Sequence, residues 1–436
     1  MKNINNQLLN FIDSTPNAYC CTDNLKEILI KNGFEEVYEY ENLKDYLKCD
    51  GKYFITRNDS SLIAFKINKC NLDPRFNIIA THSDSPSFRI KTNPDMFENG
   101  YLKLNTSGYG GMINYSWLDR PLSIAGRVIV LDKGIYKKYT INIDKDLLVI
   151  PSQAIHINNT VNSENKLDHQ IDMLPIMSLS NDQKIEDIIK QNLNNSNISF
   201  DKVCDYDLYL YNRDKAKKVG IDNEFILAPR LDDLACVFPA LHSFIDSNNK
   251  DSINVFCALN NEEIGSLTVQ GADSSFLIDT LTKISKAANF DLFKALNNSM
   301  VISADNAHAI HPNAAFKSDP TNKVYLNNGV VIKHHTNYTT DAITSSLFKG
   351  ICENAKVPYQ DFECKSNMRC GATLGGINQS HVGVDAVDIG IPQLAMHSSN
   401  ELIGSKDVLY MYKSLLEFYK TSFYKQKNMV KIKKYD

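Results

Sequence analysis

The chain has 436 residues, of which 43% are hydrophobic and 22% charged, and its formal net charge is −4. This length and composition are typical of a folded globular protein with room for more than one domain. The slightly acidic charge argues against nucleic-acid binding through bulk electrostatics, and no apolar run is long enough to span a bilayer.

The first third of the chain mixes helical and strand patterns. Apolar residues with helical spacing predict helices at 5–12 and 25–31. Short β-rich runs predict strands at 53–56, 61–67 and 76–81.

The middle of the chain has a different pattern. Long helical patterns are rare there, and short β-like pieces such as 127–131 and 139–143 are common. We therefore expect an inserted, mostly β domain at 89–221, placed within a larger domain made of residues 1–88 and 222–436.

After Pro229, apolar strands alternate with amphipathic helices. Strands are expected at 253–259, 300–304 and 391–395, and helices at 234–245, 275–287, 342–354 and 407–419. This alternation predicts an α/β fold with three layers, in which helices cover both faces of a sheet.

The N-terminal residues and the cysteines indicate the cellular compartment of the protein. The N-terminal residues 1–6 lack the apolar core of a signal peptide, and the ten cysteines include no Cys-x-x-Cys pair. Cys236 and Cys257 lie inside apolar segments, as reduced, buried thiols do. We therefore expect a cytoplasmic protein without disulfides. The lysine-rich segment 425–434 is expected to be a solvated C-terminal helix end or a frayed tail.

Two adjacent acidic residues follow the apolar strand at 253–259. Burying Glu262 and Glu263 at the end of such a strand is costly unless a positive charge lies beside them. A divalent metal would provide that charge: one carboxylate would bind the metal, and its neighbour would accept a proton from the water that the metal activates. Taken alone, the pair also fits a solvated strand end.

Further potential metal ligands lie close to the ends of other predicted elements. They are His82 and Asp84 after the strand at 76–81, Asp305 after 300–304, His397 after 391–396, and Asp232 and Asp233 before the helix at 234–245. Open α/β sheets place their sites at the carboxyl ends of strands, so these side chains could converge. Either aspartate could instead be a helix N-cap, and a single histidine after a strand could be structural.

The candidate ligands all bind metals through nitrogen or oxygen atoms. The nitrogen and oxygen donors that suit two divalent metal ions are His82, Asp232, Glu263, Asp305 and His397. Such donors favour zinc, or cobalt or manganese, and the absence of cysteine argues against a structural zinc site. Asp84 could fix the imidazole of His82 through a hydrogen bond, which leaves Glu262 as the general base.

Five segments occur along the chain in this order: His82-Ser83-Asp84-Ser85-Pro86, Pro229-Arg230-Leu231-Asp232, Asn261-Glu262-Glu263-Ile264-Gly265-Ser266, Ser303-Ala304-Asp305 with Ala307-His308-Ala309 and His311-Pro312, and Gln393-Leu394-Ala395-Met396-His397-Ser398. Together they resemble the successive motifs of the aspartyl aminopeptidases, a family of di-zinc exopeptidases. The resemblance extends from the first helices to about residue 420.

The resemblance implies a role for each matching residue. The implied metal ligands are His82, Asp232 as the bridging ligand, Glu263, Asp305 and His397, with Glu262 as the base and Asp84 beside His82. The inserted domain is implied to drive dimerisation and assembly into a tetrahedral dodecamer. Within that assembly, His156 would reach the active site of a neighbouring subunit.

The substrate pocket is also implied by the resemblance. Lys333 and Tyr338 match a stretch that lines the pocket, and Arg369 is a second candidate cation for an acidic N-terminal residue. The chain departs from the family pattern at Asn337, where arginine is common, and at Met368-Arg369 and Ala372. These departures concern specificity and leave the metal ligands untouched.

We therefore predict a cytoplasmic metallo-aminopeptidase that hydrolyses the N-terminal residue, Asp or Glu among the candidates, from peptides with a free N-terminus. The predicted cofactors are two divalent ions per subunit, most simply zinc. One alternative is an amidohydrolase or deacylase on the same two-metal core. The other is a non-catalytic oligomeric scaffold.

Overall fold

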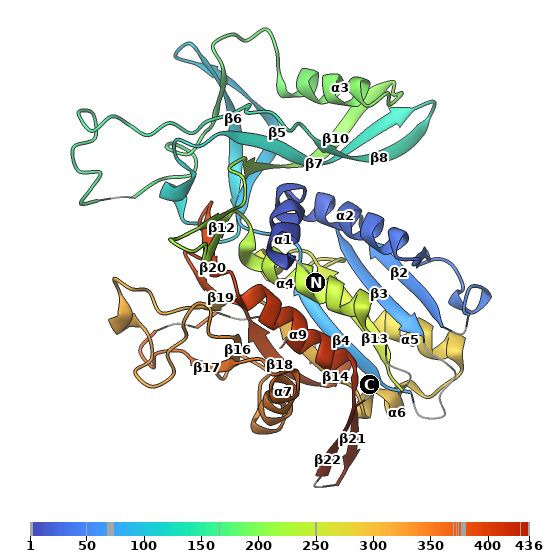
Figure 1. The fold of residues 1–436 in the computed structure, drawn as a ribbon. Helices are drawn as coiled ribbons and strands as arrows, with labels where there is room; N and C mark the ends of the chain where they lie inside the picture. Colours follow the sequence, from blue (N-terminus) through green and yellow to red (C-terminus); the bar gives the residue numbers. More distant parts are fainter. Residues whose placement is uncertain are drawn as a thin grey trace.

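The computed structural model describes residues 3–48, 50–67, 74–164, 166–248, 251–368, 370–371, 373, 375, 381–427 and 429–434. A central mixed sheet organises the larger part of the molecule, and a second sheet forms a separate lobe (Figure 1). From one edge to the other, the central sheet contains β1 (Glu35–Glu36), β2 (Gly51–Arg57), β3 (Ser61–Ile67), β13 (Ile253–Leu259), β4 (Phe76–His82), β14 (Met300–Ala304), β18 (Asp385–Gly390), β16 (Val330–His334) and β17 (Tyr359–Glu363).

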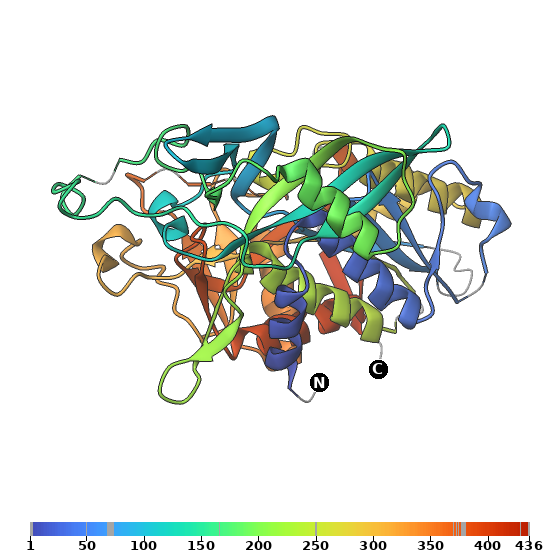
Figure 2. The ribbon, with the colours of Figure 1, turned by 90° about the horizontal axis from the view of Figure 1, so that it is seen from above.

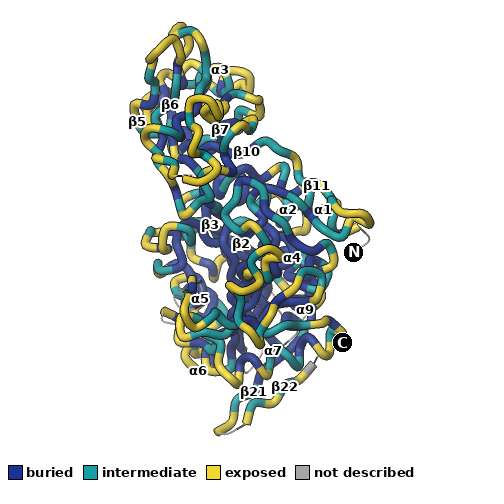
Figure 3. Tube along the Cα trace, turned by 90° about the vertical axis from the view of Figure 1, so that its left-hand side faces the viewer, coloured by how far each residue is buried: buried dark blue, intermediate teal, exposed yellow. Residues whose placement is uncertain are grey.

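Helices cover both faces of the central sheet. One face carries α1 (Ile4–Asp13), α2 (Ala18–Lys31), α4 (Leu231–Asp246), α7 (Ala342–Ala355) and α9 (Asp407–Tyr419), and the other carries α5 (Phe276–Ala288) and α6 (Leu292–Asn297). Because side chains alternate across a strand, Ile79 enters the core on the first face and Ile78 the core on the second. The predicted three-layer α/β/α architecture is confirmed. The buried trace in Figure 3 runs through this sheet and α4.

The middle strands of the sheet explain the apolar runs in the sequence. Every residue of β4, β13 and β14 is buried, so these strands read as continuous hydrophobic segments and not as alternating ones. They run parallel to one another, as β18 does beside β14. Their carboxyl ends therefore meet at one edge of the sheet.

The second sheet has its own hydrophobic core. Its strands are β8 (Ile135–Asn142), β7 (Leu122–Asp132), β10 (Lys202–Asn212), β5 (Ser87–Glu98), β6 (Tyr101–Tyr109) and β9 (Ile176–Ser178). In that core Phe88 meets Trp117 edge to face at 5.3 Å. We propose that this lobe is the inserted domain, residues 89–221.

A helix that the sequence pattern did not predict covers the second sheet. Helix α3 (Ile185–Asn195) buries Ile185, Ile189 and Leu193, which are spaced four residues apart, in the core of this lobe. Seen from above, α3 and the second sheet lie over α2 (Figure 2), and α2 contacts β7 and β8.

The strand predicted at 391–395 is not part of the central sheet. β18 ends at Gly390, and the chain then forms β19 (Pro392–Leu394), whose first residue has no backbone N–H to donate to a sheet. β19 joins a small sheet with β11 (Lys217–Val219), β12 (Phe225–Ala228), β20 (Glu401–Gly404) and β15 (Ala307–His308).

The C-terminal lysine-rich segment is neither a helix end nor a frayed tail, although most of its described residues are exposed. β21 (Thr421–Gln426) and β22 (Met429–Lys434) form an antiparallel hairpin that extends from the bottom of the molecule in Figure 1. Phe423 at its base is fully buried against α9, which anchors the hairpin. Of the helices in the described ranges, none is both long and apolar enough to cross a membrane.

Candidate metal centre

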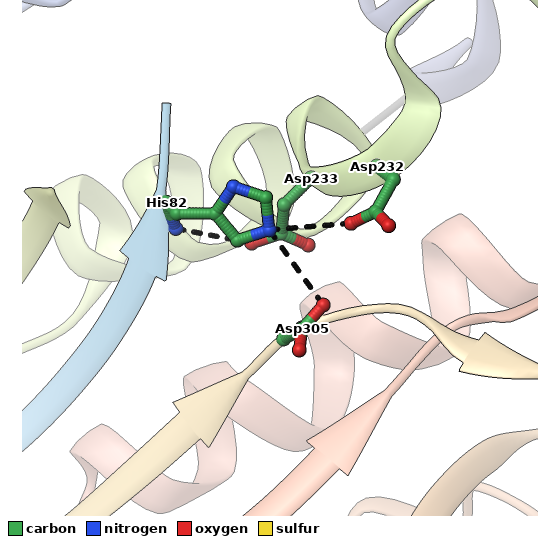
Figure 4. Close-up of side chains that lie close together, drawn as sticks. All are labelled: His82, Asp232, Asp233 and Asp305. Atoms are coloured by element: carbon green, nitrogen blue, oxygen red, sulfur yellow. Dashed lines mark hydrogen bonds and ion pairs between the residues drawn. The ribbon is translucent and has the colours of Figure 1, made fainter. Parts of the chain in front are cut away.

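One histidine and a group of aspartates face one another at the carboxyl edge of the central sheet (Figure 4). His82 ends β4, Asp232 lies at the start of α4, and Asp305 follows β14. The Nε2 atom of His82 lies 3.2 Å from Oδ1 of Asp232 and 3.7 Å from Oδ1 of Asp305. Asp233 accepts a hydrogen bond from the backbone N–H of His82 at 3.2 Å.

A second group of ligands shares Asp232 with the first. The Nε2 atom of His397 lies 3.5 Å from Oδ2 of Asp232 and 3.4 Å from Oε2 of Glu263. The two carboxylate oxygens of Asp232 thus face two different histidines. A carboxylate placed in this way could contact a cation on each side.

Both histidines are oriented by backbone carbonyls. Nδ1 of His82 donates to the carbonyl of Asp84 at 3.1 Å, and Nδ1 of His397 donates to the carbonyl of Gly111 at 2.8 Å. A carbonyl oxygen only accepts, so the proton sits on Nδ1 in each ring. Nε2 is then left with the lone pair that a metal ion requires.

The carboxylate of Asp84 orders the two adjacent glutamates. Its oxygens accept the backbone N–H groups of Glu262 at 3.1 Å and Glu263 at 3.2 Å, and the Tyr109 hydroxyl at 2.7 Å. Its Oδ1 also lies 3.5 Å from Nδ1 of His82. Asp84 therefore joins the segments that follow β4 and β13 through part-buried hydrogen bonds.

The electrostatics of the cluster reflect burial and close charge pairs. Burial alone would raise the pKa of Asp232, but the hydrogen bonds that His397 and His82 donate through Nε2 in their protonated forms hold that pKa well below its usual range. Burial raises the pKa of Glu262 to about 7, and His82 and Asp305 act on it in opposite directions.

The donor set fits divalent cations. Glu263 is 3% exposed at its side chain, and its Oε1 has no hydrogen-bond donor among the described residues. A buried carboxylate oxygen without a donor needs a cation. The surrounding ligand atoms are imidazole nitrogens and carboxylate oxygens within 4.8 Å of one another, which suits zinc or a similar ion.

The predicted substrate residues lie beside this cluster where the structure describes them. Lys333 on β16 is buried and donates to Oδ2 of Asp305 at 3.2 Å. Tyr338 accepts a hydrogen bond from the Cys370 thiol at 3.2 Å. Lys333 and Tyr338 line one pocket with Glu262 and the proposed ligands His82, Asp232, Asp305 and His397. Arg369 lies outside the described residues.

His156 is placed elsewhere. It lies in the long loop between β8 and β9, and its side chain is exposed. It is not among the described residues that line the pocket of its own chain.

One residue that contacts two of the candidate ligands could not be predicted from the sequence. Glu401, the first residue of β20, accepts the backbone N–H of Asp232 at 2.9 Å and that of His397 at 2.6 Å. A sequence pattern does not indicate which carboxylate accepts a hydrogen bond from a given backbone N–H group. The contacts of Glu401 could therefore be identified only in the folded structure.

Comparisons with known proteins identify the family. Residues 11–419 match the family model described as aminopeptidase I zinc metalloprotease (M18). The probable M18 family aminopeptidase 2 of Clostridium novyi is 43% identical over 425 residues, which cover 95% of this chain and 98% of the relative. The corresponding protein of Clostridium acetobutylicum is 45% identical over 424 residues, with the same coverage.

Solved structures agree with the sequence relatives. A cryo-EM structure of the Ape4 and Nbr1 complex contains a chain that matches with a TM-score of 0.92 and 33% identity, covering 96% of this chain and 85% of that one. The structure of the S. cerevisiae mApe1 dodecamer matches with a TM-score of 0.82 and 26% identity, covering 95% and 96%. The chain therefore belongs to the M18 family, the aspartyl aminopeptidase family that its motifs resemble, and is a zinc metallo-aminopeptidase.

Proposed function

We propose that this chain removes the N-terminal residue from peptides with the help of two divalent metal ions per subunit. His82, Asp232 and Asp305 would hold one ion, and Asp232, Glu263 and His397 the other. The observation that carries the proposal is the position of Asp232, whose two oxygens face the Nε2 atoms of two histidines.

Bound ions would lower the pKa of a water molecule and polarise the peptide carbonyl. Glu262 lines the pocket next to His82, and Asp84 fixes its backbone. In our proposal, Glu262 accepts the proton of the attacking water and passes it to the leaving amine, as a general base and then acid. Lys333, which pairs with Asp305, would hold that carboxylate in place.

The test is a panel of aminoacyl reporter substrates assayed with metal-depleted protein. We expect the depleted protein to lose activity and to regain it with zinc, cobalt or manganese, since the donor set suits all three ions. Peptides with a free N-terminus should be cleaved and their N-acylated counterparts should not. Preferential cleavage of N-acylated substrates would favour the amidohydrolase alternative, and no turnover with any reloaded ion would favour the scaffold.

We also propose a preference for N-terminal Asp or Glu, with Lys333 as the cation that selects it. Acidic reporters should then be cleaved faster than Leu or Ala reporters, and Lys333→Met should erase much of that difference. Lys349→Met is a matched control, because Lys349 pairs with Asp361 and is not a pocket residue. If neutral residues are preferred and Lys333→Met changes no ratio between substrates, Lys333 only orients Asp305, and Asn337 and Met368 become the candidates for specificity.

We propose that the chain assembles into dimers and then into a tetrahedral dodecamer, with the inserted domain forming the dimer contacts. Two observations support assembly: the structural match to the mApe1 dodecamer, and the exposed apolar side chains on either side of His156. Ile155 is 48% exposed and Ile157 80%, so contact with another subunit could bury additional apolar surface here. In the assembly, His156 would complete the active site of a neighbouring subunit.

We place the protein in the cytoplasm. The described cysteines are free, and most of them are buried, as expected for thiols in a reducing compartment.

A further inference from the structure

A buried glutamate links two of the ligand-bearing segments through their backbones. Glu401 is 2% exposed, and each of its carboxylate oxygens accepts one N–H group: Oε2 that of Asp232 and Oε1 that of His397. The side chains of these same two residues approach each other to 3.5 Å. One carboxylate thus fixes the backbones from which two neighbouring ligands project.

Neither of the two N–H groups belongs to a residue with right-handed helical backbone angles. Asp232 has φ −84° and ψ 105°, which is not helical, although it lies in the first turn of α4. His397 has φ 66°, in the left-handed region that a residue with a Cβ rarely adopts. Regular secondary structure does not account for these conformations, so the Glu401 carboxylate is one of the contacts that hold both residues. Beside it, the Ser85 hydroxyl donates to the Asp232 carbonyl and the Ile113 N–H to the His397 carbonyl.

A second buried carboxylate also accepts two backbone N–H groups, on the other side of the cluster. There the Asp84 carboxylate accepts the N–H groups of Glu262 and Glu263. Asp84 fixes the base and one ligand, and Glu401 fixes the bridging ligand and one histidine. The two buried carboxylates together hold the segments that supply Asp232, Glu262, Glu263 and His397.

We propose that Glu401 is a positioning residue for one metal position, the one formed by Asp232, Glu263 and His397. Glu401 acts on the ligands through their backbones and takes no part in the chemistry. The other position shares only Asp232 with the first, and its remaining ligands, His82 and Asp305, form no hydrogen bond with Glu401 in the described structure. Loss of Glu401 should therefore affect the two positions unequally. This inference rests on the proposed two-metal function.

The test is a competition titration in which a chelator of known affinity removes zinc from the full-length protein. Glu401→Gln keeps the size of the side chain but replaces one acceptor oxygen with an N–H donor that faces a backbone N–H. Loss of a partner behind a metal ligand typically weakens binding by about 10–100-fold. We expect that loss for the zinc held by both Asp232 and His397, and a smaller loss for the other zinc, which shares only Asp232 with it.

Asp407→Asn is the matched control. Asp407 is also a buried carboxylate that accepts two backbone N–H groups, those of Asn327 at 2.6 Å and Gly329 at 3.0 Å, and these residues carry no proposed ligand. This substitution should lower the melting temperature and leave both zinc affinities unchanged. If Glu401→Gln does not fold, Glu401→Asp gives the same comparison, because the shorter side chain cannot reach both N–H groups.

The possible results distinguish a failure of the proposed role of Glu401 from a failure of the proposed two-metal function. If the wild type binds two zinc ions and a folded Glu401 variant binds both with wild-type affinity, Glu401 has no positioning role. Equal weakening of both ions would also overturn the inference, since it requires the larger effect at the position that contains both Asp232 and His397. A wild type that binds a single zinc ion per chain would refute the proposed two-metal site, and the inference with it.

Discussion

Glu262→Gln is expected to lower turnover by about 10²–10⁴-fold, the usual contribution of a positioned acid–base group, while both metal ions stay bound. Glutamine has nearly the same shape and still leaves the backbone N–H of residue 262 on the Asp84 carboxylate. It cannot accept a proton from water at neutral pH. The measurement is kcat with saturating metal, together with the zinc content per chain.

The neighbouring glutamate provides the control. Glu263 lies 3.4 Å from His397 Nε2 through Oε2, and its other oxygen is buried without a donor in the described structure, as expected for a ligand. Glu263→Gln should therefore lose metal as well as turnover. If Glu262→Gln kept near-normal turnover at saturating metal, another group would have to be the base.

Local sequence signals were sufficient for the residues that follow the central strands. β4, β13 and β14 are buried throughout, so each appears as an apolar run, and the polar residues directly after it stand out. His82, Glu263 and Asp305 could be predicted in this way. Because the three strands are parallel neighbours, convergence followed from the fold class.

The sequence was less informative where the contacts join distant segments. His397 follows β19 in the small sheet, and its Nδ1 proton goes to the carbonyl of Gly111, 286 residues away. Glu401 reaches the backbone of Asp232 across 169 residues. Hydrogen bonds to backbone groups leave no periodic side-chain pattern, so these contacts could not be predicted before the fold was known.

His156→Ala is expected to lower turnover by about 10²–10³-fold without changing the metal content, the usual cost of removing one hydrogen-bond donor from a developing oxyanion. Within its own chain, His156 is exposed on a loop of the second lobe and is not among the described residues of the pocket. A large catalytic effect would therefore have to come from another subunit. Asn159→Ala, an exposed position in the same loop, is the control and should leave turnover unchanged.

Mixing two inactive variants tests whether His156 acts in the active site of a neighbouring subunit. His156→Ala subunits keep Glu262, and Glu262→Gln subunits keep His156. In hybrids that combine them, some sites receive Glu262 from one chain and His156 from another, so part of the activity should return once subunits exchange. Each variant exchanged with itself should stay inactive. A fully active monomer, or mixed oligomers that remain inactive although labelled subunits have exchanged, would show that the active site is complete within one chain.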